Sequence, residues 1–301
     1  MESLQNIKSR LRAVRNIGQI TKAMEVVAAT KMRKSQEIAL RTRPYAFKAL
    51  ELLSKLSRFS PLETALTKKR QVKTTLLVVI ASDRGLAGAF NTQVFRSAEK
   101  LFKADSVYAA VGKKAGKFIL KKGLSLVSGF QGFGDFVRFE DIKPLADFVI
   151  DGFKSARWDR VVTVSMHFRT ALKQEMVNQQ VLPVDFEKIE ETVKAIVPEH
   201  GKYAESLPTT NYKLQTAGID YLFEPSAKET LEMLIPHLVK MQIYHLVLEA
   251  NASEHSARRV AMKQASDNSD ELFSAFTLQY NKARQEAITK ETIEITSTIE
   301  R

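Results

Sequence analysis

Long apolar stripes at the two ends of the chain constrain its fold more than any other feature of the sequence. Residues 1–58 contain one glycine and one proline, and residues 226–301 contain one proline and no glycine, so both stretches can form long helices. In the first stretch the apolar residues recur at steps of three or four, close to the spacing of a coiled-coil seam. They are Leu4, Ile7, Leu11, Val14, Ile17, Ile20, Met24 and Val27.

The C-terminal stretch carries a matching stripe. It opens with Leu231, Leu234, Leu238, Met241 and Leu248, and it continues through Phe273, Phe276, Tyr280, Ala283 and Ala287. Between them lie the small residues Ala252, Ala257, Ala261 and Ala265, which would let two helices approach closely. A long helix needs a partner for its stripe, because propensity alone stabilises it little. The two ends therefore predict an antiparallel coiled coil; the alternative is a pair of ordinary core helices in a bundle.

The middle of the chain alternates between two patterns. Three β-rich runs are separated by helical patterns, which favours an α/β domain with a mainly parallel sheet. The strands are expected at 72–81, 106–111 and 160–168, and the helices at 92–103, 113–122 and 141–155. Residues 179–187 suit an edge strand because they include Pro183, and residues 188–212 are expected to form a loop.

These patterns predict the fold class and the domains. The fold class is α/β, with a long antiparallel coiled coil of the N- and C-terminal helices and a central Rossmann-like domain without a nucleotide site. The expected domains are residues 1–60, 70–212 and 213–301.

Charge and composition narrow the classes of partner. The formal net charge is +12, and residues 1–60 alone carry a net +9. Such a basic segment could bind nucleic acid, an anionic membrane or an acidic protein surface; the alternative is a solvated helix face with no partner. No apolar stretch has the length of a membrane span, and no cleaved export signal is expected. The sequence has no cysteine, which excludes disulfides, thiolate metal sites and cysteine nucleophiles.

The run "LLVVIASDRGLAGAFN" (Leu76–Asn91) looks like a strand that enters a phosphate-binding loop. Its glycines, Gly85 and Gly88, do not make the G-x-G-x-x-G fingerprint, and no Gly-Lys-Ser/Thr follows. Asp83 would disfavour a bound anion. We therefore expect the glycines to allow a sharp turn from strand to helix, with Arg84 presented as a charge for another contact.

No other catalytic pattern stands out. The five histidines do not form an H-E-x-x-H motif, and the serines do not form a G-x-S-x-G motif. His245 falls on the apolar stripe and is expected to pack there. The residues therefore predict a mechanical or scaffolding protein with no catalytic residue, no metal site and no cofactor.

Several long stretches of the sequence closely resemble one family, the gamma subunits of F-type ATP synthases. They occur in the family's order at both ends and in the middle: "IKSRLRAVRNIGQITKAMEVVAATKMRKSQ" (7–36), "SDRGLAGAFN" (82–91), "YLFEP" (221–225), "ASEHSARRVAMKQASDN" (252–268) and "LQYNKARQEAITKETIEI" (278–295). The chain departs from the family in ending with "TSTIER", where the family has small apolar residues.

The resemblance implies a role as the central stalk. The coiled coil would run up the axis of a ring of three alpha and three beta subunits, and the α/β domain would contact the epsilon subunit and the membrane ring of c subunits. One copy per complex would transmit rotation of the ring, driven by protons or sodium ions, to the beta subunits, where ATP is made. The complex would lie at the cytoplasmic face of a bacterial plasma membrane.

The resemblance also places contacts with the beta subunits. On the first helix they fall on Met24, Lys31 and Arg33, although Met24 could equally be a seam residue. Arg84 would be a charge contact with the stator. On the last helix the contacts fall on Arg284, Gln285, Thr289 and Glu291.

Two other classes compete with this interpretation. A nucleic-acid-binding coiled-coil protein would bind DNA with an affinity that falls steeply with salt. A nucleotide-binding α/β enzyme would be stabilised against heat by nucleotide. Binding to an alpha–beta assembly distinguishes the stalk from both.

Overall fold

The chain forms two compact units, each built partly from the two long helices. The structure is a computed structural model that describes residues 4–56, 63–134, 136–185, 224 and 226–299. One unit comprises Thr30–Ala257, and the other comprises Met1–Ala29 with Arg258–Arg301. We call the first the sheet unit and the second the coil unit. The expected loop at 188–212 lies outside the described residues, and the expected three-domain division stays a prediction.

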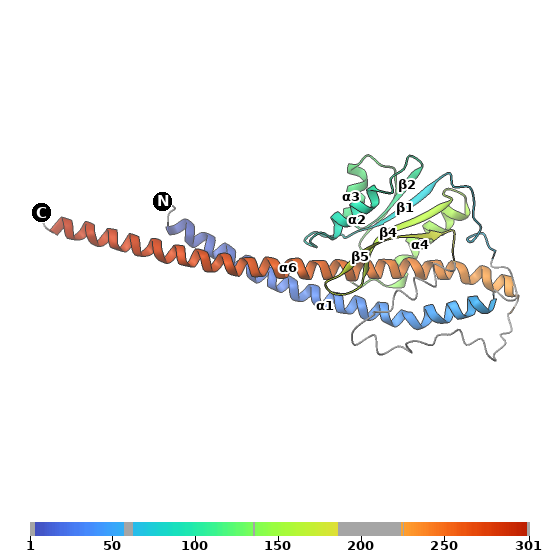
Figure 1. The fold of residues 1–301 in the computed structure, drawn as a ribbon, viewed down its shortest axis with the longest axis horizontal. Coiled ribbons are helices and arrows are strands. Elements are labelled where there is room, and N and C mark those ends of the chain that lie inside the picture. Colours follow the sequence, from blue (N-terminus) through green and yellow to red (C-terminus); the bar gives the residue numbers. More distant parts are fainter. Residues whose placement is uncertain (1–3, 57–62, 135, 186–223, 225, 300–301) are drawn as a thin grey trace. The chain divides into compact units, whose positions relative to one another are not determined.

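The described elements alternate as the sequence predicts (Figure 1). In chain order they are α1 (Leu4–Leu56), β1 (Thr75–Ile80), α2 (Phe90–Glu99), β2 (Ser106–Val111), α3 (Lys113–Lys121), β3 (Leu126–Phe130), α4 (Phe139–Lys154), β4 (Arg160–Phe168), β5 (Gln174–Leu182) and α6 (Ala227–Ile299).

The sheet has the strand order β3-β2-β1-β4-β5. Strands β1 to β4 are parallel to one another, and β5 is antiparallel to β4 at the edge. The prediction of an edge strand is confirmed, but β5 begins five residues earlier than expected, because three of the five residues Gln174–Asn178 are polar and weaken the β signal. Strand β3 was not predicted, since it has only five residues and its side chains alternate between half-buried and exposed.

Helices cover both faces of the sheet (Figure 1). All six residues of β1 are buried, as expected for a central parallel strand. On one face Leu77 and Val79 belong to an apolar cluster with residues of α2 and α3. On the other face Leu76 and Val78 belong to a cluster with residues of α4 and of the first part of α6. The predicted apolar stripe that opens α6 is thus confirmed as a core face.

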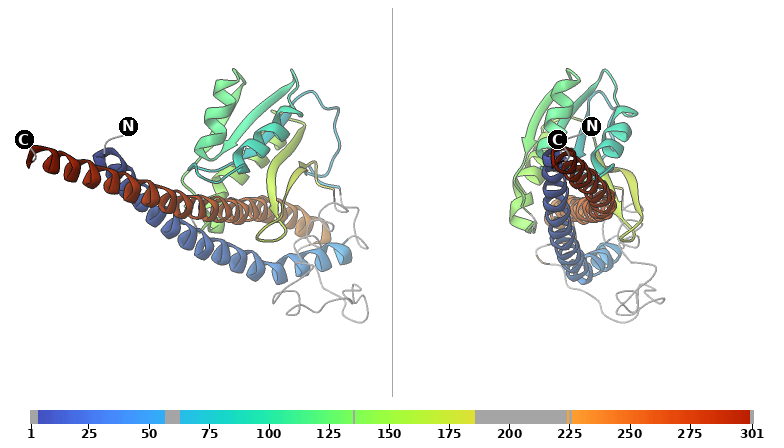
Figure 2. Two further views of the ribbon diagram at one scale, coloured as in Figure 1. Left: turned by 60° about the vertical axis from the view of Figure 1, so that its left-hand side comes forward. Right: turned by 90° about the vertical axis from the view of Figure 1, so that its left-hand side faces the viewer.

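The coil unit is an antiparallel pair of helices, formed by residues 4–29 of α1 and 258–299 of α6 (Figure 2). This confirms the predicted coiled coil, but its seam differs from the predicted stripe after Val14. Along this part of α1 a series of buried and half-buried residues alternates in steps of four and three: Ile7, Leu11, Val14, Gly18, Thr21, Glu25 and Ala28. Met24 and Ala29 are half-buried beside this series.

Three large apolar residues of the predicted stripe face outward. Ile17, Ile20 and Val27 are exposed by 52%, 59% and 50%. Gly18 takes the seam position instead, so close to the partner helix that an added Cβ would lie 3.3 Å from the Cβ of Ser269. The prediction was wrong here because small and polar residues fill the seam, and an apolar pattern cannot register them.

The partner helix shows the same arrangement. Met262, Ser266 and Ser269 are buried in the seam, whereas Phe273 of the predicted stripe is 37% exposed and Ala287 is exposed. None of the helices in the described part of the chain is long and apolar enough to cross a membrane.

Candidate functional site

The glycine loop after β1 contacts neighbouring turns of its own chain at the carboxyl ends of the strands. In nucleotide-binding folds the carboxyl ends of parallel strands and a helix N-terminus present free backbone N–H groups to a bound phosphate. Here the carboxylate of Asp83 accepts hydrogen bonds from the backbone N–H of Lys113, at the start of α3, at 2.9 Å and from that of Gly132 at 3.0 Å. These donors are thus engaged by a fixed negative charge, which gives Asp83 a structural role.

Polar contacts and unusual backbone angles shape the rest of this loop. Asn91 accepts a hydrogen bond from the backbone N–H of Ser82 at 3.1 Å. Of the two glycines in the loop, only Gly88 has a positive φ, of 53°. The second positive φ falls on Leu86, at 62°, a conformation that is uncommon for a non-glycine residue. Leu86 is 63% exposed and Arg84 is exposed. The loop therefore presents an apolar side chain, on a backbone of unusual φ, two residues from a cation.

Gly112 permits the close approach of the next strand–helix turn. Its φ is 89°, and an added Cβ would lie 2.1 Å from the carbonyl oxygen of Ala81. The sequence did not identify this glycine, because no motif marks it.

The predicted contact residues are divided between the two units. Met24 is half-buried in the coil unit, so the choice between seam packing and contact with a partner stays open. Lys31 is half-buried and Arg33 is exposed, and both belong to the sheet unit, as does Arg84.

The predicted residues of the last helix all lie exposed in the coil unit: Arg284, Gln285, Thr289 and Glu291. Of these, Gln285 and Thr289 line a shallow groove of about 660 Å³ along α6, together with Ile293. The Thr289 hydroxyl donates to the carbonyl of Gln285 at 2.9 Å, so it is held to its own helix. Their contact with a beta subunit stays a prediction.

A second groove lies between the two helices of the coil unit. It measures about 870 Å³ and is lined by residues of both helices, among them Gly18, Lys22, Val26, Asp270 and Phe273. The Lys22 ammonium donates to Glu25 at 3.0 Å. The pKa of Lys22 is raised by this hydrogen bond and by the charge of Glu25, with smaller contributions from Asp267 and Asp270.

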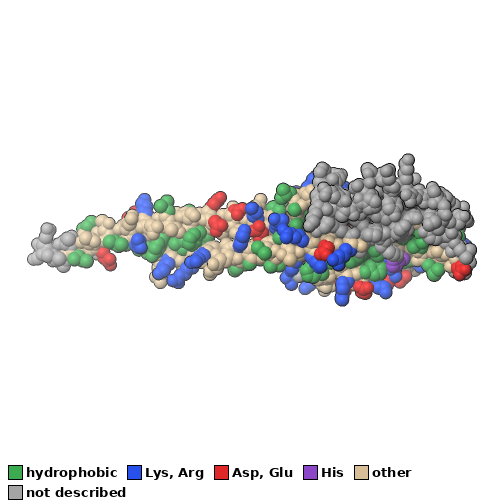
Figure 3. Space-filling view, turned by 90° about the horizontal axis from the view of Figure 1, so that it is seen from below, with side chains coloured by type: hydrophobic (Ala, Val, Ile, Leu, Met, Phe, Trp, Pro, Cys, Tyr) green, Lys and Arg blue, Asp and Glu red, His purple; other side chains and the backbone are tan. Residues whose placement is uncertain are grey.

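Outward apolar side chains are the feature of the coil unit that the sequence did not predict. They occur on both helices, where Figure 3 shows hydrophobic side chains interspersed with Lys and Arg. They are Ile17, Ile20, Val26, Val27, Leu272, Leu278, Ile288, Ile293 and Ile295, each at least half exposed. Single exposed apolar residues are ordinary, but so many along one helical pair indicate a surface that another protein covers. The sequence signal for these outward residues is the run of steps of three at Val14, Ile17 and Ile20, where a coiled-coil seam would alternate three and four.

Metal chemistry has no evident site in the part of the chain that the structure describes. There, no group of three or more His, Asp or Glu residues could hold a metal ion. The fold and the surface therefore define a class: an α/β domain carried on a coiled coil whose functional surface is a protein interface.

Comparisons with known proteins identify the family. The family model described as ATP synthase matches residues 3–300. The ATP synthase gamma chain of Roseiflexus castenholzii is 39% identical over 99% of this chain and 97% of its own length, and that of Cytophaga hutchinsonii is 34% identical over 98% and 97%. The chain therefore belongs to the ATP synthase gamma chain family, as its resemblance in sequence predicts.

Solved structures show the same fold. A chain in the mitochondrial ATP synthase of Euglena gracilis, in an OSCP/F1/c-ring structure, has a TM-score of 0.66, covering 98% of this chain and 93% of that chain at 24% identity. A chain of the Tetrahymena thermophila central stalk/c-ring structure has a TM-score of 0.57, covering 82% and 99%, also at 24% identity.

Proposed function

We propose that this chain is the rotor shaft of an F-type ATP synthase and passes rotation between the membrane ring of c subunits and the catalytic ring of alpha and beta subunits. The observation that carries the proposal is the coil unit, with a close approach of its helices at Gly18 and Ser269 and with large apolar residues on its outer surface. Two helices packed this closely make a thin shaft, and its apolar surface suits a surrounding sleeve of protein.

The chemistry of ATP belongs to the beta subunits in this proposal. The chain itself is non-catalytic. This is supported by the glycine loop, which lacks a phosphate-binding fingerprint and places the carboxylate of Asp83 against the start of α3. Family membership supports the epsilon subunit and the c-ring as further partners of the sheet unit. The complex would lie on the cytoplasmic face of a bacterial plasma membrane, which the bacterial relatives support.

Basic residues would make the sliding contacts with the beta subunits. Arg33, Arg84 and Arg284 are exposed cations that can meet acidic loops. Exposed ion pairs contribute only about 0–1 kcal/mol each, so such contacts can form and break as the shaft turns. A deeply buried pair would resist rotation.

The test is ATPase activity of purified alpha and beta subunits with and without this chain, with size-exclusion profiles alongside. The proposal expects the chain to enter a complex with them and to raise turnover. Free chain and unchanged turnover would overturn it. A variant with Ile17, Ile20 and Val27 all changed to Ser keeps the seam intact, so it tests whether the outward apolar surface drives assembly.

A further inference from the structure

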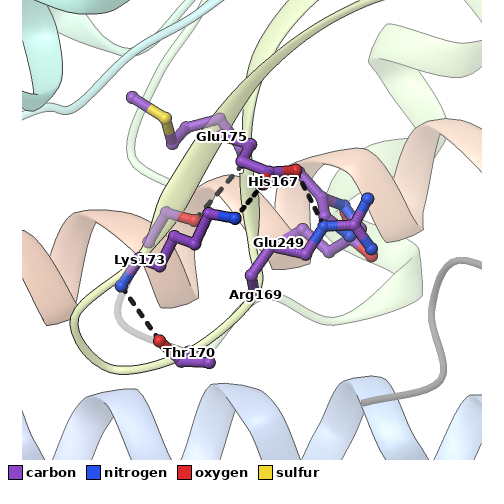
Figure 4. A network of polar contacts seen from close by, with 8 residues as sticks. His167, Arg169, Thr170, Lys173, Glu175 and Glu249 are labelled. Carbon is purple, nitrogen blue, oxygen red and sulfur yellow. Dashed lines mark hydrogen bonds and ion pairs between the residues drawn. The ribbon is translucent and has the colours of Figure 1, made fainter. Parts of the chain in front are cut away.

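Three residues on one face of α6 hold the β4–β5 hairpin by polar contacts. Glu249, Ser253 and Ser256 follow each other at steps of four and three, so they share one side of the helix. The imidazole Nδ1 of His167, at the end of β4, lies against the carboxylate of Glu249 (Figure 4).

The two serines extend the contact toward the hairpin turn. The Ser253 hydroxyl donates to the carbonyl of Met166 at 3.4 Å. The Ser256 hydroxyl donates to the carbonyl of Ala171 at 2.6 Å and accepts from the side-chain amide of Gln174 at 3.2 Å. We call Glu249, Ser253, Ser256 and their hairpin partners the hairpin clamp.

The clamp is buried, so the loss of any of its hydrogen bonds would leave a polar group without water or partner. The side chains of His167 and Glu249 are 10% and 11% exposed, and Ser253 and Ser256 are fully buried. A buried polar group that loses its partner keeps its full desolvation cost, so these contacts hold only one arrangement of hairpin and helix.

The hairpin is braced from within as well. On its outer part, Glu175 accepts from Arg169 at 3.0 Å and pairs with Lys173 at 3.0 Å, as Figure 4 shows. The backbone N–H of Lys173 donates to the hydroxyl of Thr170 at 3.0 Å, which fixes the turn. Glu175 is therefore engaged by hairpin cations, and Glu249 is the carboxylate that His167 meets from α6.

We propose that the hairpin clamp is the joint through which the sheet unit and α6 exchange torque, with His167 and Glu249 as its positioning pair. The inference rests on the proposed rotor function. Elsewhere along α6, the Tyr244 hydroxyl donates to the carbonyl of Val137 at 3.1 Å and Lys240 pairs with Asp147, so these polar contacts join α6 to α4 and the segment before it. The apolar contacts of α6 with the sheet have no preferred direction and can slide. The clamp joins the sheet to the helix by directional bonds at its last positions before the sheet unit ends at Ala257.

Replacing both His167 and Glu249 by apolar residues distinguishes a role in transmitting torque from a role in stability alone. Replacing both partners of a buried polar pair by apolar side chains of similar size can leave the stability nearly unchanged, but it cannot restore the directional contact. The variants are His167→Leu, Glu249→Leu and the double variant. Glu232→Leu, at an exposed carboxylate of the same helix, is the matched control.

The variants are compared in the assembled alpha–beta complex by two measurements. The first is amide hydrogen exchange in residues 166–174, which the single variants should accelerate roughly tenfold to a hundredfold. The second is torsional stiffness, taken from the angular fluctuations of a bead attached to the sheet unit while the alpha–beta ring is fixed. The double variant should recover the native melting temperature and still show reduced stiffness.

Native stiffness in the double variant would overturn the inference, as would native exchange in the single variants. If a Leu variant does not assemble, His167→Gln and Glu249→Gln provide the test, since each retains a hydrogen bond and should keep stiffness near native; marked loss in both would also overturn it. A native complex that does not rotate would contradict the proposed function instead, while the exchange measurement would still test the clamp.

Discussion

The contact between Gly152 and Trp158 allows a prediction with a calculable magnitude. Gly152 lies in α4, and an added Cβ would fall 1.8 Å from Cζ2 of the Trp158 ring. The indole is 1% exposed, and its Nε1–H donates to the carbonyl of Val149 at 3.1 Å. The ring cannot move aside without leaving its cavity and breaking this hydrogen bond.

The change Gly152→Ala should therefore destabilise the sheet unit. Displacing a large buried aromatic side chain costs about 3–5 kcal/mol. The better helix propensity of alanine returns about 1 kcal/mol, which leaves a net loss of roughly 2–4 kcal/mol. For a unit of this size the melting temperature should fall by roughly 5–15 °C.

Thermal unfolding followed by tryptophan fluorescence measures this directly, because Trp158 is the single tryptophan of the chain. Gly129→Ala is the control, since an added Cβ at Gly129 would meet no atom within 4 Å. In a Trp158→Leu background, followed by circular dichroism, Gly152→Ala should cost at least about 1 kcal/mol less than in the native chain. A melting temperature unchanged by Gly152→Ala, or an equal cost in both backgrounds, would refute the reasoning.

Other predictions concern single charges and contacts. The pKa of Asp159 is lowered chiefly by hydrogen bonds from backbone N–H groups before β1. The contribution of Asp159 to stability is therefore present above the ordinary Asp pKa and is lost as the pH falls through the lowered value. In Asp159→Asn the free energy of unfolding, measured against pH, should fall less steeply in acid. Asp83→Ala should lower the stability by about 1 kcal/mol, measured by urea unfolding, and added ATP should not restore it. Arg284→Ala and Gln285→Ala, both at exposed positions, should lower the ATPase rate of the complex while unfolding stays within about 0.5 kcal/mol of native; equal losses of stability would contradict a contact role. Met24→Lys should lower the protons pumped per ATP hydrolysed without preventing assembly, and an unchanged ratio would count against a coupling role.

Periodicity and β propensity were sufficient to predict the frame of the sheet unit. Strands β2 and β4 have the predicted bounds, because each is a short, largely apolar run with the β-branched and aromatic residues that are typical of buried parallel strands. Strand β3 escaped, since an exposed edge strand of five residues carries too little pattern to distinguish it from a loop.

The seam shows a different limit of sequence patterns. Apolar periodicity predicted that the ends would pair, but it assigned Ile17 and Ile20 to the seam that Gly18 and Thr21 occupy. Where the two helices approach most closely, the short distance admits only small residues, and the neighbouring large apolar residues are exposed.

The residues of the hairpin clamp could not be predicted from the sequence. His167 and Glu249 are 82 positions apart, and neither belongs to a motif. Their contact depends on the register between β4 and α6, which only tertiary packing determines. The same holds for Asp83 and Gly132, which a turn in the fold brings together.

Direct observation of rotation tests the central claim most directly. The alpha–beta ring is fixed to a surface, a bead is attached to the sheet unit of this chain, and ATP is added. The account predicts stepwise rotation of the bead in one direction that stops when ATP is removed. A complex that hydrolyses ATP at the full rate while the bead shows only random angular motion would contradict the assignment of this chain as the rotor shaft.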